Sequence, residues 1–174
     1  MALIDGWQGR WFEDLAVGDT YRHPLGRTIT STDNAWFTLL TQNTNPIHFD
    51  HHYAAQTTFE RPLVDSTFTL ALVTGQSVTD VSQHALANLG WDDVRLPAPV
   101  FEGDTIYSQS TVTAARASRS RPDVGIVTVA TTGYNQHGTT VITFERTIMV
   151  YRRGHGPQRP RPEPDHTAVD DAAS

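Results

Sequence analysis

Residues 65–78, DSTFTLALVTGQSV, are the stretch that decides the fold. Asp65, Ser66 and Thr67 can cap the start of a helix, and residues 68–73 that follow are almost wholly apolar. A helix that is apolar on all sides belongs in the interior of a domain. We therefore expect one buried central helix, covered by the elements that flank it in the sequence.

The sequence after this helix is typical of long antiparallel strands. Four runs rich in Val, Ile, Thr and Tyr lie at residues 88–95, 104–115, 124–135 and 139–151, and the turn Asn135-Gln136-His137-Gly138 joins the last two. Before the central helix we expect a strand at residues 20–29. A short amphipathic helix follows it, with start signals at residues 30–33 and an apolar stripe of Trp36, Phe37, Leu39 and Leu40. This order predicts an α+β domain in which a curved antiparallel sheet wraps a central helix.

Length and composition limit the chemistry that the chain can perform. Its 174 residues correspond to one domain, which we place at residues 1–151, followed by a tail rich in Pro and Arg at residues 152–174 that we predict to be disordered. The chain has no Cys, and its 13 basic residues are all Arg. Disulfides, thiolate catalysis and Schiff-base lysine chemistry are therefore excluded.

Charge and hydrophobicity also exclude several classes of partner. A formal net charge of −6 argues against general binding to nucleic acids or anionic membranes. The chain contains no apolar run of the roughly 20 residues that a membrane span requires. Its first residues, MALIDGWQGRWFEDL, contain acids and no apolar core of the kind found in signal peptides. We therefore expect a cytoplasmic protein that binds neither nucleic acid nor membrane.

The candidate site is the polar stretch at residues 43–50, NTNPIHFD, which stands between the two predicted helices. Asn45-Pro46 imposes an extended or turn conformation, and loops of this composition often carry functional sites. If His48 faces the start of the central helix, a neutral imidazole can move a proton while free backbone N–H groups stabilise an oxyanion. This arrangement suits chemistry at a thioester carbonyl. A structural, hydrogen-bonding role for His48 is the alternative.

Several separated motifs resemble one protein family. They are residues 43–48 (NTNPIH), residues 59–64 (FERPLV) before the central helix, and residues 96–104 (LPAPVFEGD) after it. Together they resemble the MaoC-like (R)-specific enoyl-CoA hydratases of the hot-dog fold, over about residues 12–150. Residues 88–95 (NLGWDDVR) and 120–126 (SRPDVGI) are most similar to the branch of itaconyl-CoA or mesaconyl-CoA hydratases.

The resemblance implies a single hot-dog domain that forms homodimers or larger oligomers, with active sites at the dimer interface and coenzyme A along its surface. It also implies reversible addition of water to a 2-enoyl thioester. In the family, an Asp and a His hold the water, and a backbone N–H at the start of the central helix polarises the carbonyl. The His falls on His48, the helix-start donors fall on Ser66 and Thr67, and the Asp falls on Asn43.

The Asn at position 43 changes the expected chemistry, because a carboxamide can orient a water molecule but cannot take its proton. Either His48 performs all of the proton transfer, or another carboxylate assists it. Asp65 is the candidate carboxylate, since it stands where the hydratases commonly place a His; its alternative role is an ordinary N-cap. Asp50 is a less favoured candidate.

Two further clusters contain residue types that can bind ligands. His48, Asp50 and His52 alternate as in a metal site of two His and one carboxylate, but Pro46 and the turn after Tyr53 leave little room for a flat strand, and we expect no metal. Another cluster lies between two predicted strands and could bind the phosphates of coenzyme A, with a solvated loop as the alternative. It consists of Arg116, Arg119 and Arg121.

We therefore expect a hydro-lyase that hydrates or dehydrates an enoyl-CoA thioester, or the equivalent acyl carrier protein thioester, with a short branched or carboxylated acyl group. It needs no cofactor beyond its thioester substrate. A hot-dog thioesterase is the first alternative, because a carboxylate such as Asp65 could direct water to the thioester carbon. A non-catalytic acyl-CoA binding subunit is the second, and Asn43 is the residue that points to it.

Overall fold

The computed structural model describes residues 2, 4–158, 160 and 162. Most of the predicted tail at residues 152–174 lies outside the described residues. The first two residues of that tail contact the folded domain. The backbone N–H of Arg152 donates to the carbonyl of Asp123 at 2.9 Å, and the guanidinium of Arg153 pairs with Asp14 at 2.5 Å.

The described chain forms short helical elements, three α-helices and a set of strands. In chain order they are η1 (Phe12–Asp14), β1 (Thr20–Arg22), β2 (Arg27–Thr28), α1 (Ser31–Thr41), η2 (Pro46–His48), α2 (His51–Ala54), α3 (Ser66–Gln76), η3 (Val78–Ser82), β3 (Ala85–Arg95), β4 (Thr105–Ala117), β5 (Val124–Tyr134) and β6 (Thr140–Tyr151). Within the described residues, no helix combines the length and the hydrophobicity that a membrane span needs.

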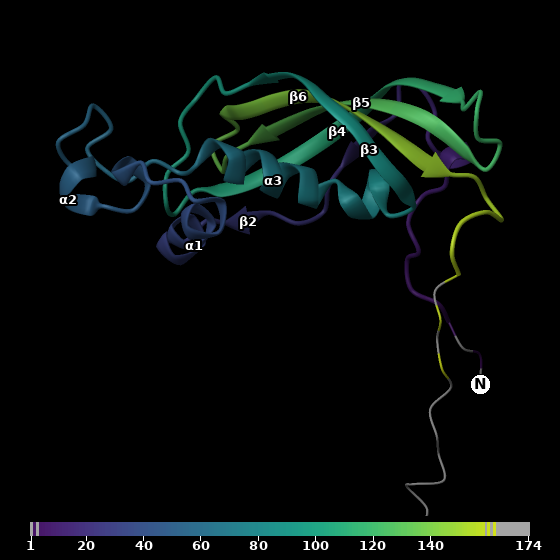
Figure 1. Ribbon diagram of the computed structural model, residues 1–174, viewed down its shortest axis with the longest axis horizontal. Helices are drawn as coiled ribbons and strands as arrows, with labels where there is room; N and C mark the ends of the chain where they lie inside the picture. Colours follow the sequence, from purple (N-terminus) through teal and green to yellow (C-terminus); the bar gives the residue numbers. More distant parts are fainter. Residues whose placement is uncertain (1, 3, 159, 161, 163–174) are drawn as a thin grey trace, which may run out of the picture.

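The strands form one antiparallel sheet in the order β1-β4-β5-β6-β3, and β2 pairs with the first residues of β4. The sheet curves around α3, while α1 and α2 lie together beside one end of it (Figure 1). The predicted α+β class, with a central helix against a curved antiparallel sheet, is confirmed. β3 is an edge strand, so one side of its backbone has no strand beside it among the residues that the structure describes.

The central helix lies very close to the sheet. A Cβ atom at Gly133 of β5 would lie 2.8 Å from the Val73 side chain of α3, so glycine permits this approach. Thr69 and Val73 are almost fully buried against the sheet, whereas Ala71 and Gly75 on the opposite side of α3 are exposed. The expectation of burial on all sides is therefore wrong for a single chain, because the sheet covers only one face of the helix.

The strand predicted at residues 20–29 is divided into β1 and β2. Between them the His23 side chain turns inward and bonds to Asp80 of η3 at 2.9 Å and to Ser110 of β4 at 3.0 Å. Pro24 follows directly and has no N–H to donate to the sheet. A buried polar contact therefore interrupts what the composition suggested was one strand.

Helix α1 begins as predicted, because Thr30 and Asp33 form reciprocal capping bonds. Its orientation agrees only in part with the apolar stripe, because Phe37 packs on Phe68 of α3 at 5.1 Å between ring centroids while the other members of the stripe face outward. Leu39 and Leu40 are 77% and 79% exposed, whereas Asn34 is fully buried. Where Asn34 faces inward, α1 meets backbone carbonyls, which is why a polar residue occupies that position.

Candidate active site

The loop that carries His48 is built by two successive helix caps. The side chain of Asn45 accepts from the N–H of Ile47 at 3.2 Å, with Pro46 in the first position of η2. The side chain of Asp50 then accepts from the N–H of Tyr53 at 2.9 Å and starts α2. The polar stretch at residues 43–50 thus contains η2 and leads directly into α2, and His48 is the last residue of η2.

The ring of His48 has a defined orientation. Its Nδ1 lies 2.8 Å from the carbonyl oxygen of Leu63, and a carbonyl can only accept, so Nδ1 carries the hydrogen in the neutral ring. Nε2 then bears a lone pair. Within the described residues, Nε2 makes no hydrogen bond and is not among the buried nitrogens that lack a partner. His48 therefore presents a basic nitrogen that water can reach.

Asp65 is the N-cap of α3. Its Oδ1 accepts from the Thr67 N–H at 2.7 Å, from the Thr67 hydroxyl at 2.6 Å and from the Phe68 N–H at 3.3 Å. Burial alone would raise the pKa of Asp65, but these bonds and one from the Asn43 amide outweigh it and hold the pKa below its ordinary value. A carboxylate with a lowered pKa is a weak proton acceptor, so this geometry favours the N-cap role.

The side chain of Asn43 is held at both ends. Its Nδ2 donates to Asp65 Oδ2 at 2.6 Å, and its Oδ1 accepts from the backbone N–H of Asn45 at 3.1 Å. His48 is bonded to position 63 and Asn43 to position 65, so both side chains are anchored to one short segment that leads into α3. One hydrogen on Asn43 Nδ2 stays available to an incoming molecule.

The two backbone donors expected at the start of α3 differ in what they can do. The Thr67 N–H already donates to Asp65. The Ser66 N–H has no acceptor within the described part of the chain and lies at the positive end of the helix dipole. This leaves Ser66 as the backbone donor available to an oxyanion.

A residue that sequence reasoning missed joins these parts. Asn34 of α1 is fully buried, and its Nδ2 donates to the carbonyls of His48 at 2.7 Å and Leu63 at 3.1 Å. Its Oδ1 accepts from the N–H of Asp65 at 3.0 Å. The only signal in the sequence was an Asn within a predicted helix, a position that this residue type does not favour without a hydrogen-bonding reason.

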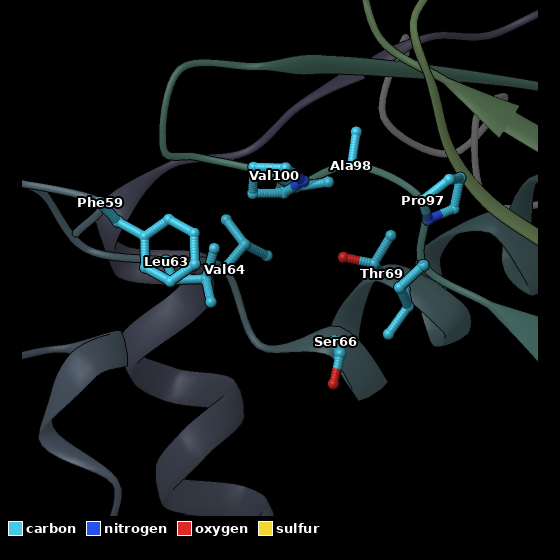
Figure 2. A pocket seen from close by; sticks show the side chains of 10 residues that line it. Phe59, Leu63, Val64, Ser66, Thr69, Pro97, Ala98 and Val100 are labelled. Carbon is cyan, nitrogen blue, oxygen red and sulfur yellow. The ribbon is translucent and has the colours of Figure 1, made fainter. Parts of the chain in front are cut away.

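Two cavities lie beside this cluster. One, of about 270 Å³, lies between the start of α3 and the segment after β3; Figure 2 shows Ser66 and Thr69 of α3 on one side of it and Val100 on the other. Its lining residues are Phe59, Leu63, Val64, Ser66, Thr69, Leu96, Pro97, Ala98, Pro99 and Val100. The second, of about 440 Å³, has a largely apolar wall that includes Asn43, Leu39 and Phe49.

The other predicted clusters are not part of this arrangement. Asp50 caps α2, and His52 lies within α2, so with His48 they do not share a strand face. No group of three or more His, Asp or Glu side chains arranged to bind a metal ion occurs among the described residues. Arg116, Arg119 and Arg121 lie at or next to the turn between β4 and β5, at the opposite end of the sheet from α1 and α2 (Figure 1).

Comparison with known proteins gives a consistent picture. The family model described as mesaconyl-CoA hydratase matches residues 6–170. The chain is 34% identical over 166 residues to the mesaconyl-CoA hydratase of Cereibacter sphaeroides, covering 95% of this chain and 48% of that protein. It is 30% identical over 138 residues to the (R)-specific enoyl-CoA hydratase of Aeromonas caviae, covering 79% of this chain and 97% of that protein. The chain thus spans about half the length of its mesaconyl-CoA hydratase relative.

Solved structures agree with the sequence relatives. A MaoC domain protein dehydratase from Chloroflexus aurantiacus superposes with a TM-score of 0.82 at 32% identity, covering 94% of this chain and 46% of that one. A Mycobacterium tuberculosis protein with a double hot-dog fold gives a TM-score of 0.78 at 23% identity, covering 93% of this chain and 50% of that one. The fold is therefore the hot-dog fold, as the sequence motifs indicated.

Proposed function

The chain belongs to the MaoC-like mesaconyl-CoA hydratase family, and from this premise we propose that it is a hydro-lyase acting on an enoyl-CoA thioester. It adds water across the 2,3 double bond or removes it in the reverse direction. The observation that carries the proposal is the orientation of His48, whose Nδ1–H is bonded to the Leu63 carbonyl and whose Nε2 is left as a base.

His48 carries the proton transfer in this proposal. Its Nε2 takes a proton from a water molecule while the water oxygen bonds to C3 of the acyl group, and the electrons of the double bond move to the thioester oxygen as an enolate. The imidazolium then returns the proton to C2, so that one water has been added. Both carboxylate oxygens of Asp65 already accept hydrogen bonds, in capping α3 and in holding Asn43, which supports His48 as the single acid–base group.

The Ser66 N–H stabilises the enolate oxygen. It is the free donor at the N-terminus of an 11-residue helix, where the helix dipole adds to its effect on a negative charge. Asn43 orients the water through its remaining amide hydrogen, because its other polar positions are held by Asp65 and Asn45. An Asn can fill this role because orientation needs a hydrogen bond and not a proton acceptor.

For the substrate, we propose a short branched or carboxylated acyl group of the mesaconyl type, carried on coenzyme A. The names of the relatives support this class, since mesaconyl-CoA hydratase and beta-methylmalyl-CoA dehydratase both match at 34% identity. The small cavity next to Ser66 favours a short acyl group. A coenzyme A substrate agrees with the cytoplasmic location expected from the sequence.

We also propose that the active unit contains two hot-dog domains, here as a homodimer. The edge strand β3 exposes Leu89 and Trp91, and Ala71 and Gly75 leave one side of α3 uncovered. Relatives of twice the length have room for a second such domain in the same chain. In such a dimer, we propose that the arginines at the β4–β5 turn of one subunit (Arg116, Arg119 and Arg121) bind the coenzyme A phosphates at the active site of the other.

The test is to incubate the protein with crotonyl-CoA, mesaconyl-CoA and itaconyl-CoA and to follow the conjugated enoyl absorbance together with product masses. We expect loss of absorbance and gain of one water on an intact thioester, and turnover lowered by about 10²–10⁴-fold in His48→Ala. Release of free coenzyme A thiol would instead indicate a thioesterase. Binding of the thioesters without any change in mass would indicate a non-catalytic subunit.

A further inference from the structure

One buried side chain bonds to two of the backbone segments that form the candidate site. Asn34 is 0% exposed, and each of its polar atoms is used. Nδ2 donates to the carbonyls of His48 and Leu63 at 2.7 and 3.1 Å, and Oδ1 accepts from the backbone N–H of Asp65 at 3.0 Å. These bonds join α1 to the His48 loop and to the segment that enters α3.

The three backbone groups that Asn34 contacts belong to, or adjoin, the residues of the proposed reaction. The His48 carbonyl belongs to the residue whose imidazole is the proposed base. The Leu63 carbonyl is the same atom that fixes the His48 ring, at 2.8 Å from Nδ1. The Asp65 N–H immediately precedes the Ser66 N–H, the proposed oxyanion donor. Asn34 therefore sets where the base stands relative to the donor, although it touches neither a reacting atom nor the substrate.

Relative placement of this kind matters because proton transfer and oxyanion stabilisation act on one molecule at the same time. A displacement of about 1 Å in such a pair can cost about 10²-fold in rate. His48 and Ser66 are 18 positions apart in the sequence, in different elements, and the Leu63–Asp65 segment with Asn34 is what joins them. Loss of Asn34 would remove three of the hydrogen bonds that hold the loop and the helix start together, and would leave their placement to the His48–Leu63 and Asn43–Asp65 bonds.

We propose that Asn34 is a positioning residue for the hydratase site, holding His48 and the start of α3 in register through three hydrogen bonds. The effect on turnover rests on the proposed function, whereas the effect on the His48 ring does not. Asn34 lies outside the motifs by which the chain resembles the family, because it is on α1, 14 positions before His48.

The experiment compares the wild-type protein with Asn34→Ala and Asn34→Asp. The alanine variant removes all three bonds. The aspartate variant keeps the size of the side chain and the acceptor for the Asp65 N–H, but it replaces the donor to the two carbonyls with a second acceptor. The matched control is Thr131→Val in β5, outside the site. It removes a buried hydroxyl that is hydrogen-bonded to Ser110 of β4 at 2.8 Å.

Two readouts are measured on each folded protein. The first is kcat and KM for enoyl-CoA hydration, for which we expect kcat to fall about 10²-fold in both Asn34 variants while KM stays within about threefold. The second is the ¹⁵N NMR spectrum of the histidine rings, with the His48 signals assigned through His48→Ala. We expect Nδ1–H in the wild-type protein and a mixture of ring states in the Asn34 variants.

The control separates positioning from stability. Thr131→Val should lower the unfolding midpoint and leave kcat and the His48 ring signals unchanged. The proposal is overturned if a folded Asn34 variant keeps both kcat and the ring signals, or if Thr131→Val reduces kcat equally. If the wild-type protein hydrates no thioester, the proposed function fails, and the ring signals alone decide the role of Asn34. If the alanine variant does not fold, the aspartate variant decides.

Discussion

Asp65 offers a sharp test, because its two carboxylate oxygens serve two separate tasks. Oδ1 caps α3 through the N–H groups of Thr67 and Phe68, and Oδ2 accepts from Asn43 at 2.6 Å. Ser is about as good an N-cap as Asp, so Asp65→Ser keeps the cap and loses only the bond to Asn43. Asp65→Ala loses both.

The magnitudes follow from these bonds. A lost N-cap costs about 1 kcal/mol, and a lost hydrogen bond to a charged group costs about 2 kcal/mol. Asp65→Ala should therefore lower the free energy of unfolding by about 3 kcal/mol, and Asp65→Ser by about 2 kcal/mol. For a domain of this size the difference of about 1 kcal/mol corresponds to about 2–4 °C in Tm.

The assay pairs thermal unfolding with kcat for enoyl-CoA hydration. Both variants release Asn43, so both should reduce kcat by a similar factor of about ten, well below the effect of removing a positioned general base. Equal stability of Asp65→Ala and Asp65→Ser would refute the inference that Oδ1 caps α3 while Oδ2 holds Asn43. A loss of kcat in Asp65→Ser as large as that in His48→Ala would show instead that Asp65 takes part in proton transfer.

Three other outcomes are expected. His48→Ala should lower kcat/KM by about 10²–10⁴-fold in the hydration assay, and turnover near the wild-type value would contradict its role. Folding lowers the pKa of Asp65, so the carboxylate contributes its full stabilisation above its unfolded-state pKa and loses it as the pH falls through its folded-state pKa. The difference in unfolding free energy between the wild type and Asp65→Ser should therefore shrink between pH 7 and pH 3. Urea titrations at the two pH values measure this difference, and a constant difference would disprove the prediction. Arg146 is fully buried, its Nε and Nη2 have no hydrogen-bond partner within the described part of the chain, and burial lowers its pKa to about 10. Arg146→Met should therefore leave Tm unchanged or raise it, and a clear fall in Tm would show that the guanidinium stabilises the fold.

Much of the architecture was predictable because it follows from local patterns. The long β-rich runs after residue 88 and the turn at residues 135–138 correspond to β3, β4, β5 and β6 within a few residues. The start of α1 was visible in the reciprocal caps of Thr30 and Asp33. The family motif also led to His48 and to the start of α3, since these residues lie in short contiguous segments.

The features that sequence patterns predicted wrongly all depend on what surrounds an element. The apolar stripe of α1 indicated an inward face, yet Leu39 and Leu40 face outward while Asn34 is buried. The buried helix is covered on one side only. A periodic pattern shows which apolar side chains share one face of a helix, but it does not show which face packs against the rest of the chain.

By itself, the sequence determined the α+β class and the family and indicated the residue types of the candidate site, because hydrophobic periodicity, caps and contiguous motifs are local properties. Only the tertiary structure decided what each polar group does. It assigned Asp65 to the cap of α3, directed the Nδ1–H of His48 to the Leu63 carbonyl and placed Asn34 between them. The reason is that a buried hydrogen bond depends on the distance and angle between groups far apart in the sequence, and only the folded chain sets these.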